Sequence, residues 1–231
     1  MKSFLLLLLL TSIAWSQKPE DHTCRILFLN GPDTAPEKLI LFDGVGAQEV
    51  ELPRLNLSPV YKLRSGDLSL HLLKNIPSDP KAIPEGAPSV NVPAGTGDFY
   101  LILTSDPSNT VVPVHAQVVN ATGNQLGRGE MLWFNLTQKT IAGQVGTEKV
   151  VLKPSSRTVV KAPANVKEDH AVDLYFRLPD DDFVYPLCKT RWRHDPQVRK
   201  LVFIFEEGKR RSPRIQAFTD YRMPVKSESM N

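Results

Sequence analysis

The residues best suited to binding chemistry form a basic stretch near the C-terminus. Nine lysines and arginines lie between Lys189 and Arg214, opposed by three acidic residues. Within this stretch we expect a cationic surface patch made of Arg191, Trp192, Arg193, Lys209, Arg210 and Arg211. An indole between two arginines could stack on a sugar ring or on a guanidinium plane. Such a patch would bind an anionic glycan, a lipid head group or another envelope protein.

A plainer interpretation of the same stretch remains open. If it forms a strand, Trp192 is buried on one side while Arg191 and Arg193 point to solvent on the other. The charge of the whole chain is only +3, and it falls to +2 without Lys2. A balance so close to neutral argues against nucleic acid as the partner.

The carboxylates and histidines predict no metal centre and no cofactor. Three carboxylates at Asp180–Asp182 could offer oxygen ligands to Ca²⁺, but the spacing of a calcium loop is missing. We therefore expect a solvated turn after Pro179. No two histidines are two or four positions apart, the spacings at which a strand or helix presents paired ligands. The histidines are His22, His71, His115, His170 and His194.

Two cysteines, Cys24 and Cys188, leave two alternatives open. In an oxidising compartment they could pair, which would tie the first strand to a segment near the C-terminus. Otherwise they are buried thiols. Cys188 lies six residues before His194, yet nothing marks these two as a catalytic pair.

Sequence motifs of catalysis are missing as well. The chain has no GxSxG, HExxH or SxxK motif and no phosphate-binding loop. We expect a non-enzymatic binding or structural module. The alternative is a glycan- or small-molecule-active enzyme whose site is assembled from dispersed residues such as Asp180–Asp182 and His194.

The elements that must position these residues are short strands. Apolar or alternating runs recur about every ten residues with turn residues between them, and 19 prolines argue against long helices. In the first half we expect strands at Arg25–Leu29, Lys38–Phe42, Gln48–Leu52, Val60–Leu63, Leu68–Leu73, Ser89–Val92, Phe99–Leu103 and Val111–Val119. Such spacing is typical of an all-β sandwich or barrel.

The second half repeats the order of the first at an offset of about a hundred residues. The matched segments are 27–30 with 132–135, 49–53 with 150–154, 68–72 with 172–176, 99–103 with 201–205 and 114–118 with 214–218. The repeat predicts two tandem immunoglobulin-like (Greek-key) β-sandwich domains that arose by duplication. We place them at residues 24–120 and 130–222, with a linker at 121–129 and a disordered tail at 223–231.

Several turn motifs of the first half resemble a family of exported bacterial β-sandwich domains of unknown function. They are Leu29-Asn30 with Pro32-Asp33, Asp43-Gly44, Arg64-Ser65-Gly66 and Val92-Pro93-Ala94-Gly95. The resemblance covers residues 24–120, and the second half lacks the Asp-Gly pair. It implies an envelope or extracellular location without enzyme activity, and it assigns no functional residues.

The N-terminus has the features of a secretory signal. Lys2 precedes an apolar run, and Ala14-Trp15-Ser16 places small residues where a signal peptidase reads them. The run has about a dozen residues, fewer than the ~20 that span a bilayer as a helix. We expect removal of residues 1–16 and export to the periplasm, the cell envelope or the medium, with no transmembrane segment left in the mature chain.

Overall fold

The computed structural model describes residues 21–161, 167–178, 181–208 and 210–221. This part of the chain contains no helix, so it offers no helix that could span a membrane. Its sixteen strands form four four-stranded sheets. The prediction of an all-β protein with two tandem β-sandwich domains is confirmed. The expected signal segment and the expected tail at 223–231 lie outside the described residues.

The first sandwich consists of β1 to β8, in sheets of order β4-β1-β7-β8 and β3-β2-β5-β6. The strands are β1 (His22–Phe28), β2 (Lys38–Phe42), β3 (Ala47–Glu51), β4 (Tyr61–Leu63), β5 (Leu68–Leu73), β6 (Ser89–Val92), β7 (Asp98–Ser105) and β8 (Val114–Asn120). Most neighbouring strands pair in antiparallel fashion, but β1 and β7 pair in parallel.

The second sandwich has the same topology with every strand number raised by eight. Its sheets have the orders β12-β9-β15-β16 and β11-β10-β13-β14, and β9 runs parallel to β15. The strands are β9 (Met131–Asn135), β10 (Thr140–Val145), β11 (Glu148–Leu152), β12 (Ser156–Val160), β13 (Asp169–Arg177), β14 (Val184–Arg193), β15 (Arg199–Phe205) and β16 (Arg214–Asp220). All five segment pairs matched in the sequence occupy equivalent strands, as a duplication requires.

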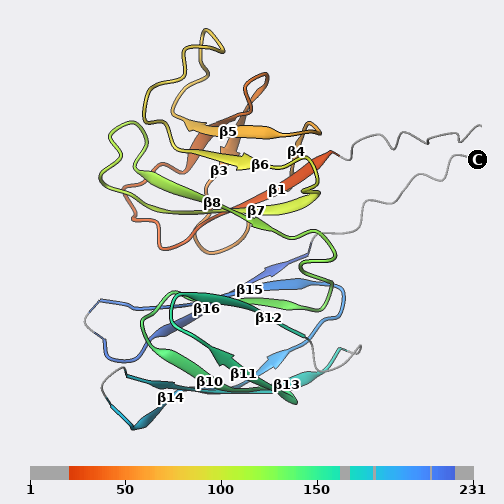
Figure 1. Cartoon of the computed structure of the whole chain (residues 1–231), viewed down its shortest axis with the longest axis vertical. Coiled ribbons are helices and arrows are strands. Elements are labelled where there is room, and N and C mark those ends of the chain that lie inside the picture. The colour runs from red at the N-terminus through yellow and green to blue at the C-terminus, as the bar shows by residue number, and fades with distance from the viewer. Residues whose placement is uncertain (1–20, 162–166, 179–180, 209, 222–231) are drawn as a thin grey trace, which may run out of the picture.

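The four sheets stack as four layers (Figure 1). The sheets that contain β1 and β9 are the inner layers and face each other across the seam between the domains. Four central strands, β1, β7, β9 and β15, therefore have both faces covered. Burial on both faces explains why they read as nearly continuous apolar runs rather than as alternating ones.

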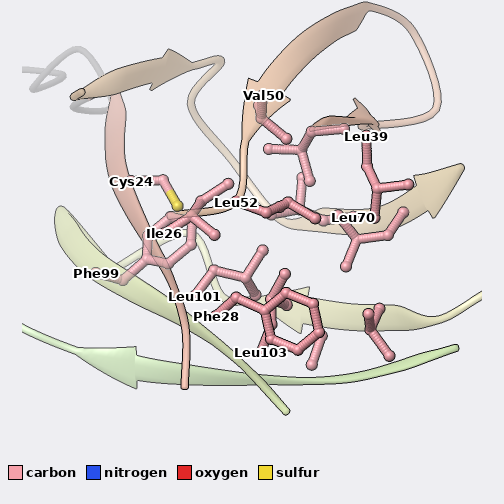
Figure 2. Packing of buried hydrophobic residues seen from close by; sticks show 14 of the residues in the cluster. Cys24, Ile26, Phe28, Leu39, Val50, Leu52, Leu70, Phe99, Leu101 and Leu103 are labelled. Carbon is pink, nitrogen blue, oxygen red and sulfur yellow. The ribbon is translucent and has the colours of Figure 1, made fainter. Parts of the chain in front are cut away.

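Each sandwich has a core of its own between its two sheets. In the first, Ile26 and Phe28 of β1 meet Leu39 of β2 and Leu70 of β5, with Cys24 at one end (Figure 2). In the second, Trp133 of β9 is the largest fully buried side chain.

A third apolar cluster fills the seam between the domains. It joins residues from both inner sheets, the linker and the loops after β1 and β3: Leu27, Leu29, Leu57, Tyr100, Ile102, Val119, Ala121, Leu126, Leu132, Phe134, Leu201, Phe203, Phe205 and Phe218. Phe134 and Phe203 stack with ring centroids 4.7 Å apart. Interfaces between domains of one chain are usually more polar than this, so the seam resembles a domain core.

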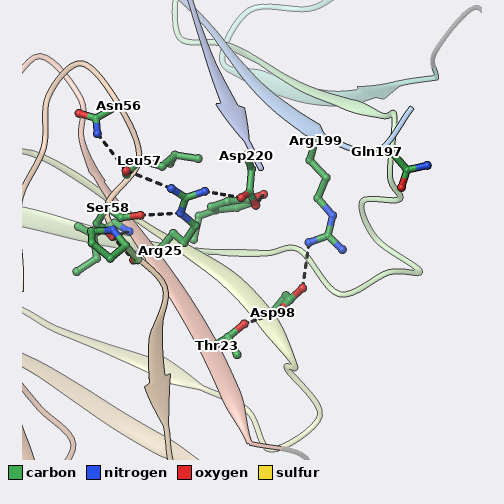
Figure 3. Close-up of polar contacts among 12 residues, drawn as sticks. Thr23, Arg25, Asn56, Leu57, Ser58, Asp98, Gln197, Arg199 and Asp220 are labelled. Atoms are coloured by element: carbon green, nitrogen blue, oxygen red, sulfur yellow. Dashed lines mark hydrogen bonds and ion pairs between the residues drawn. The ribbon is translucent and has the colours of Figure 1, made fainter. Parts of the chain in front are cut away.

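Ion pairs join the two domains at the edge of this cluster (Figure 3). Arg25 of β1 donates from Nη1 to Oδ1 of Asp220 at 2.6 Å, and the hydroxyl of Tyr100 donates to Oδ2 of the same carboxylate at 2.5 Å. Arg199 of β15 donates to Asp98 of β7 at 3.1 Å. The last residue of β16 is thus held by the inner sheet of the first domain.

Two strands of the second domain, β10 and β12, were not predicted from the sequence, and a strand through Arg191–Arg193, which the structure shows as part of β14, was only one of the interpretations left open. The strand β10 contains Gly143, where a Cβ atom would lie 2.0 Å from the carbonyl oxygen of Asp173, so only glycine fits. The strand β12 is polar and mostly exposed. The ten-residue edge strand β14 contains Pro186 at a β-bulge opposite Leu174 and Tyr175, the kind of place where a sheet tolerates proline.

Candidate functional site

The predicted cationic patch is divided into two separate clusters. Arg191 and Arg193 lie at the end of β14, beside Asp169. Arg210 and Arg211 lie near the start of β14, where Arg211 contacts Tyr185. From Tyr185 to Trp192 is about 23 Å along an extended strand. One small anion therefore cannot reach both clusters; Lys209 lies outside the described residues.

Acidic neighbours partly neutralise the cluster near the start of β14. Arg211 donates to Asp181 at 3.1 Å and to the hydroxyl of Tyr185 at 2.6 Å, with its guanidinium 4.4 Å from the Tyr185 ring centroid. Arg210 pairs with Glu207. The Tyr185 hydroxyl, which donates to Asp181, lowers the pKa of that carboxyl.

These contacts involve Asp181, one of the three carboxylates for which the sequence favoured a solvated turn over a calcium site. The oxygens of Asp181 already accept hydrogen bonds from Tyr185, Arg211 and the backbone N–H of Phe183. The dispersed enzyme site would need Asp181 and His194 to lie close together, but they lie at opposite ends of β14. That pair is not brought together, and Asp180 lies outside the described residues.

Trp192 is placed as the strand interpretation predicted, with its side chain toward the core and its two arginine neighbours toward solvent. It is half-buried against the second core and stacks on Trp133, with centroids 5.5 Å apart and an interplanar angle of 12°. The stacked face is not open to a sugar ring. Arg191 and Arg193 on either side of it are exposed, as strand alternation requires.

The two cysteines are not bridged to each other. Cys24 lies in the core of the first sandwich, whereas Cys188 packs against the core of the second. Burial raises the pKa of the Cys188 thiol, which makes it a poor nucleophile. The disulfide alternative is therefore not realised in this structure, because the two side chains belong to different domains.

A cleft lies at the seam between the two domains. It encloses about 650 Å³. The β1–β2 loop, the segment after β3 and the edge strand β16 line it through Asn30, Gly31, Asp33, Glu37, Lys38, Glu51, Leu52, Pro53, Arg54, Leu55, Asn56, Arg214 and Gln216. Ligand sites occur preferentially at such domain boundaries.

Turn chemistry shapes the wall of this cleft. Asn30 has a φ of 53°, a left-handed conformation that asparagine tolerates better than most residues. Gly31 follows because a Cβ there would lie 2.8 Å from the ring of Phe28. Arg54 then ties the two loops together by donating from Nη2 to the carbonyl oxygen of Ala35 at 2.8 Å. Its Nε is buried without a hydrogen-bond partner in the described structure.

The lining of the cleft is balanced in charge. It contains three carboxylates, three cationic side chains and three amides, together with Leu55, which is 85% exposed. No aromatic ring is among the described lining residues. Beside it runs β16, which in the described structure hydrogen-bonds as a strand to β15 alone and so presents an open sheet edge.

Sequence reasoning did not find this cleft. The signal that could have pointed to it was the turn motif at Leu29-Asn30, which was interpreted only as a turn, and Arg54 was not singled out. The cleft also needs β16 of the second domain, and the packing of one domain on the other has no local signature.

Neither a family model nor a curated protein matches this sequence. Among solved structures, it is similar to a DUF3823 family protein from Bacteroides ovatus, with 10% identity and a TM-score of 0.24. The similarity covers 74% of this chain and 97% of that chain.

Proposed function

We propose that the protein is an exported, non-enzymatic binding module of the cell envelope or extracellular space, and that it holds an extended segment of a partner polypeptide in the seam cleft. The observation that carries this proposal is the cleft of about 650 Å³ beside the open edge of β16. Export is inferred from the N-terminal signal features of the sequence.

The open edge favours a polypeptide ligand. An extended peptide can add a strand to a sheet edge through main-chain hydrogen bonds, while pockets beside the edge receive alternate side chains. Arg214 and Gln216 are two apart on β16, so they share one face, and both line the cleft. A peptide paired with β16 would place side chains between this strand and the loops of the first domain.

The lining chemistry favours the same class of ligand. Three carboxylates and three cations suit a peptide of mixed charge better than a polyanion. Leu55 offers an exposed apolar contact for one anchoring side chain. The lack of an aromatic ring in the described lining disfavours a sugar, because sugar binding draws on aromatic stacking surfaces.

A binding survey with a designed variant tests the proposal. Residues 17–231 are applied to arrays of random peptides, neutral and anionic polysaccharides, peptidoglycan and lipids at low and high salt. We expect peptide binding that Leu55→Asp weakens at least tenfold. Val45→Asp is the matched control, because Val45 is 76% exposed on another loop of the first domain and does not line the cleft.

The competing outcome is distinct. Binding to anionic ligands that survives Leu55→Asp but is lost in Arg191→Ala/Arg193→Ala or Arg210→Ala/Arg211→Ala would assign function to a basic cluster instead. Hydrolysis of a ligand on the array would instead support the alternative that the protein is an enzyme.

A further inference from the structure

Histidine and tryptophan side chains gather at one end of the second core. His170 at the start of β13 is paired directly with Trp192 near the end of β14, and His194 follows two residues later. Directly paired residues and residues two apart on a strand point to the same side of a sheet. All three side chains therefore face the inner sheet, where Trp133 of β9 stacks on Trp192.

The polar atoms of His170 are buried without partners. The residue is 5% exposed, and neither Nδ1 nor Nε2 has a hydrogen-bond partner in the described structure. A neutral imidazole carries one N–H donor and one lone pair, and native proteins rarely bury both unmet. A lone pair of this kind is a ready ligand for a metal ion.

His194 lies at a distance that suits a shared ion. Its ring centroid is 6.2 Å from that of His170, with an interplanar angle of 69°. With metal–nitrogen bonds of about 2 Å, two imidazoles on opposite sides of one ion have centroids about 6 Å apart. Since His170 has no hydrogen-bond partner, this spacing is not that of a hydrogen-bonded histidine pair.

The number and type of ligands around the two histidines decide which class of metal ion the site would suit. Among the described residues no group of three or more His, Cys, Asp or Glu side chains is placed to hold a metal. Zn²⁺ usually requires four ligands and Ca²⁺ six or more, whereas Cu⁺ and Ag⁺ accept two. Met131 and Trp133 of β9 belong to the same buried apolar cluster.

Two further features act on the charge of the ion. The electron-rich indole of Trp192, paired directly with His170 across the strands, favours a cation nearby. The ammonium group of Lys200 lies 5.9 Å from the centroid of the Trp192 ring and opposes any added positive charge. Lys200 repels a dication about twice as strongly as a monocation.

We propose that His170 and His194 form a two-imidazole site for a soft monovalent cation, Cu⁺ or Ag⁺, beside Trp192. The site is independent of the seam cleft, and its failure would leave the peptide proposal untouched.

Tryptophan fluorescence can report this site directly. The chain has three tryptophans, and Trp15 falls in the expected signal segment. In residues 17–231 the fluorescence therefore comes from Trp133 and Trp192 alone. Titration with Ag⁺, and with Cu⁺ from a competing chelator under anaerobic conditions, is carried out in a Cys188→Ser background to remove the accessible thiol. We expect quenching that saturates at one ion per chain.

Variants separate the site from adventitious binding. His170→Phe and His194→Asn should each weaken Ag⁺ binding at least 100-fold, while His115→Ala on an exposed position of β8 should leave it unchanged. Zn²⁺ should bind at least 100-fold more weakly than Ag⁺. Circular dichroism checks that each variant is folded, and if His170→Phe is not, His194→Asn alone carries the comparison.

The proposal is overturned by any of three results. These are the absence of quenching by either ion, unchanged Ag⁺ affinity in the folded histidine variants, or Zn²⁺ affinity equal to or greater than that for Ag⁺.

Discussion

Substituting Asp220 by alanine should lower the free energy of unfolding more than the substitution of any exposed charged residue. Its side chain is fully buried and accepts from Arg25 and from the hydroxyl of Tyr100. Removing one partner of a buried ion pair costs about 3–5 kcal/mol, because the remaining charge stays desolvated. Arg25 is 15% exposed and also donates to the carbonyl oxygens of Ser58 and Leu57. The lower end of that range, about 3 kcal/mol in the free energy of unfolding, is therefore expected.

Urea denaturation followed by tryptophan fluorescence and circular dichroism measures this effect. Tyr100→Phe removes one hydrogen bond to the same carboxylate and should cost about 1–2 kcal/mol. Because both substitutions act on one network, the double variant should cost less than the sum of the single ones. Asp182→Ala, at an exposed position, serves as the control and should change stability by less than about 0.5 kcal/mol. A cost below about 1 kcal/mol for Asp220→Ala would refute the view that this carboxylate holds the domains together.

Three other predictions follow from the structure. Burial and nearby cations lower the pKa of His170 below its ordinary 6.5, so the unfolded chain takes up a proton at this residue before the folded chain does. The free energy of unfolding should therefore stay level above about pH 6.5 and fall as the pH drops below that value. Urea titrations at pH 7.5 and 5.5 measure this fall, which should be smaller in His170→Phe. Gly143→Ala should cost at least about 3 kcal/mol, because its Cβ would meet a backbone oxygen, whereas Gly95→Ala, with open space around it, should change the unfolding midpoint little. A reducing agent should leave the melting temperature of residues 17–231 unchanged, because Cys24 and Cys188 are not bridged; a clear drop would contradict their placement.

The sequence predicted most strands because turn residues and apolar runs are local signals. Lys38–Phe42, Leu68–Leu73 and Ser89–Val92 were predicted with the bounds that the structure has. The duplicated order was visible for the same reason, since equivalent strands keep equivalent burial. The strand β10 was not predicted because the pattern of Gly143-Gln144 resembles a turn.

The candidate sites could not be predicted because they depend on contacts between distant segments. Arg191 and Arg211 belong to one basic stretch of the sequence, yet most of the length of the strand β14 separates their neighbourhoods. His170 and His194 are 24 positions apart, so no ligand spacing along a single strand marks them as a pair. Pairing of β13 with β14 brings them together.

The arrangement of the two domains was equally hidden. Runs such as Phe99–Leu103 were read as strands of a sandwich, without the inference that both faces are buried. A fully apolar strand is the sequence signal for such burial, and here it marks the seam. The cleft beside β16 exists only because the domains meet there.

Amide hydrogen exchange with a peptide selected on the array tests the central claim most directly. If the seam cleft holds an extended polypeptide, added peptide should slow exchange in β16 and in the segment 52–56, and Leu55→Asp should abolish that protection. Protection confined to Arg191–Arg193 or to the loop before β16, with β16 itself unchanged, would contradict the account and move the binding site to a basic cluster.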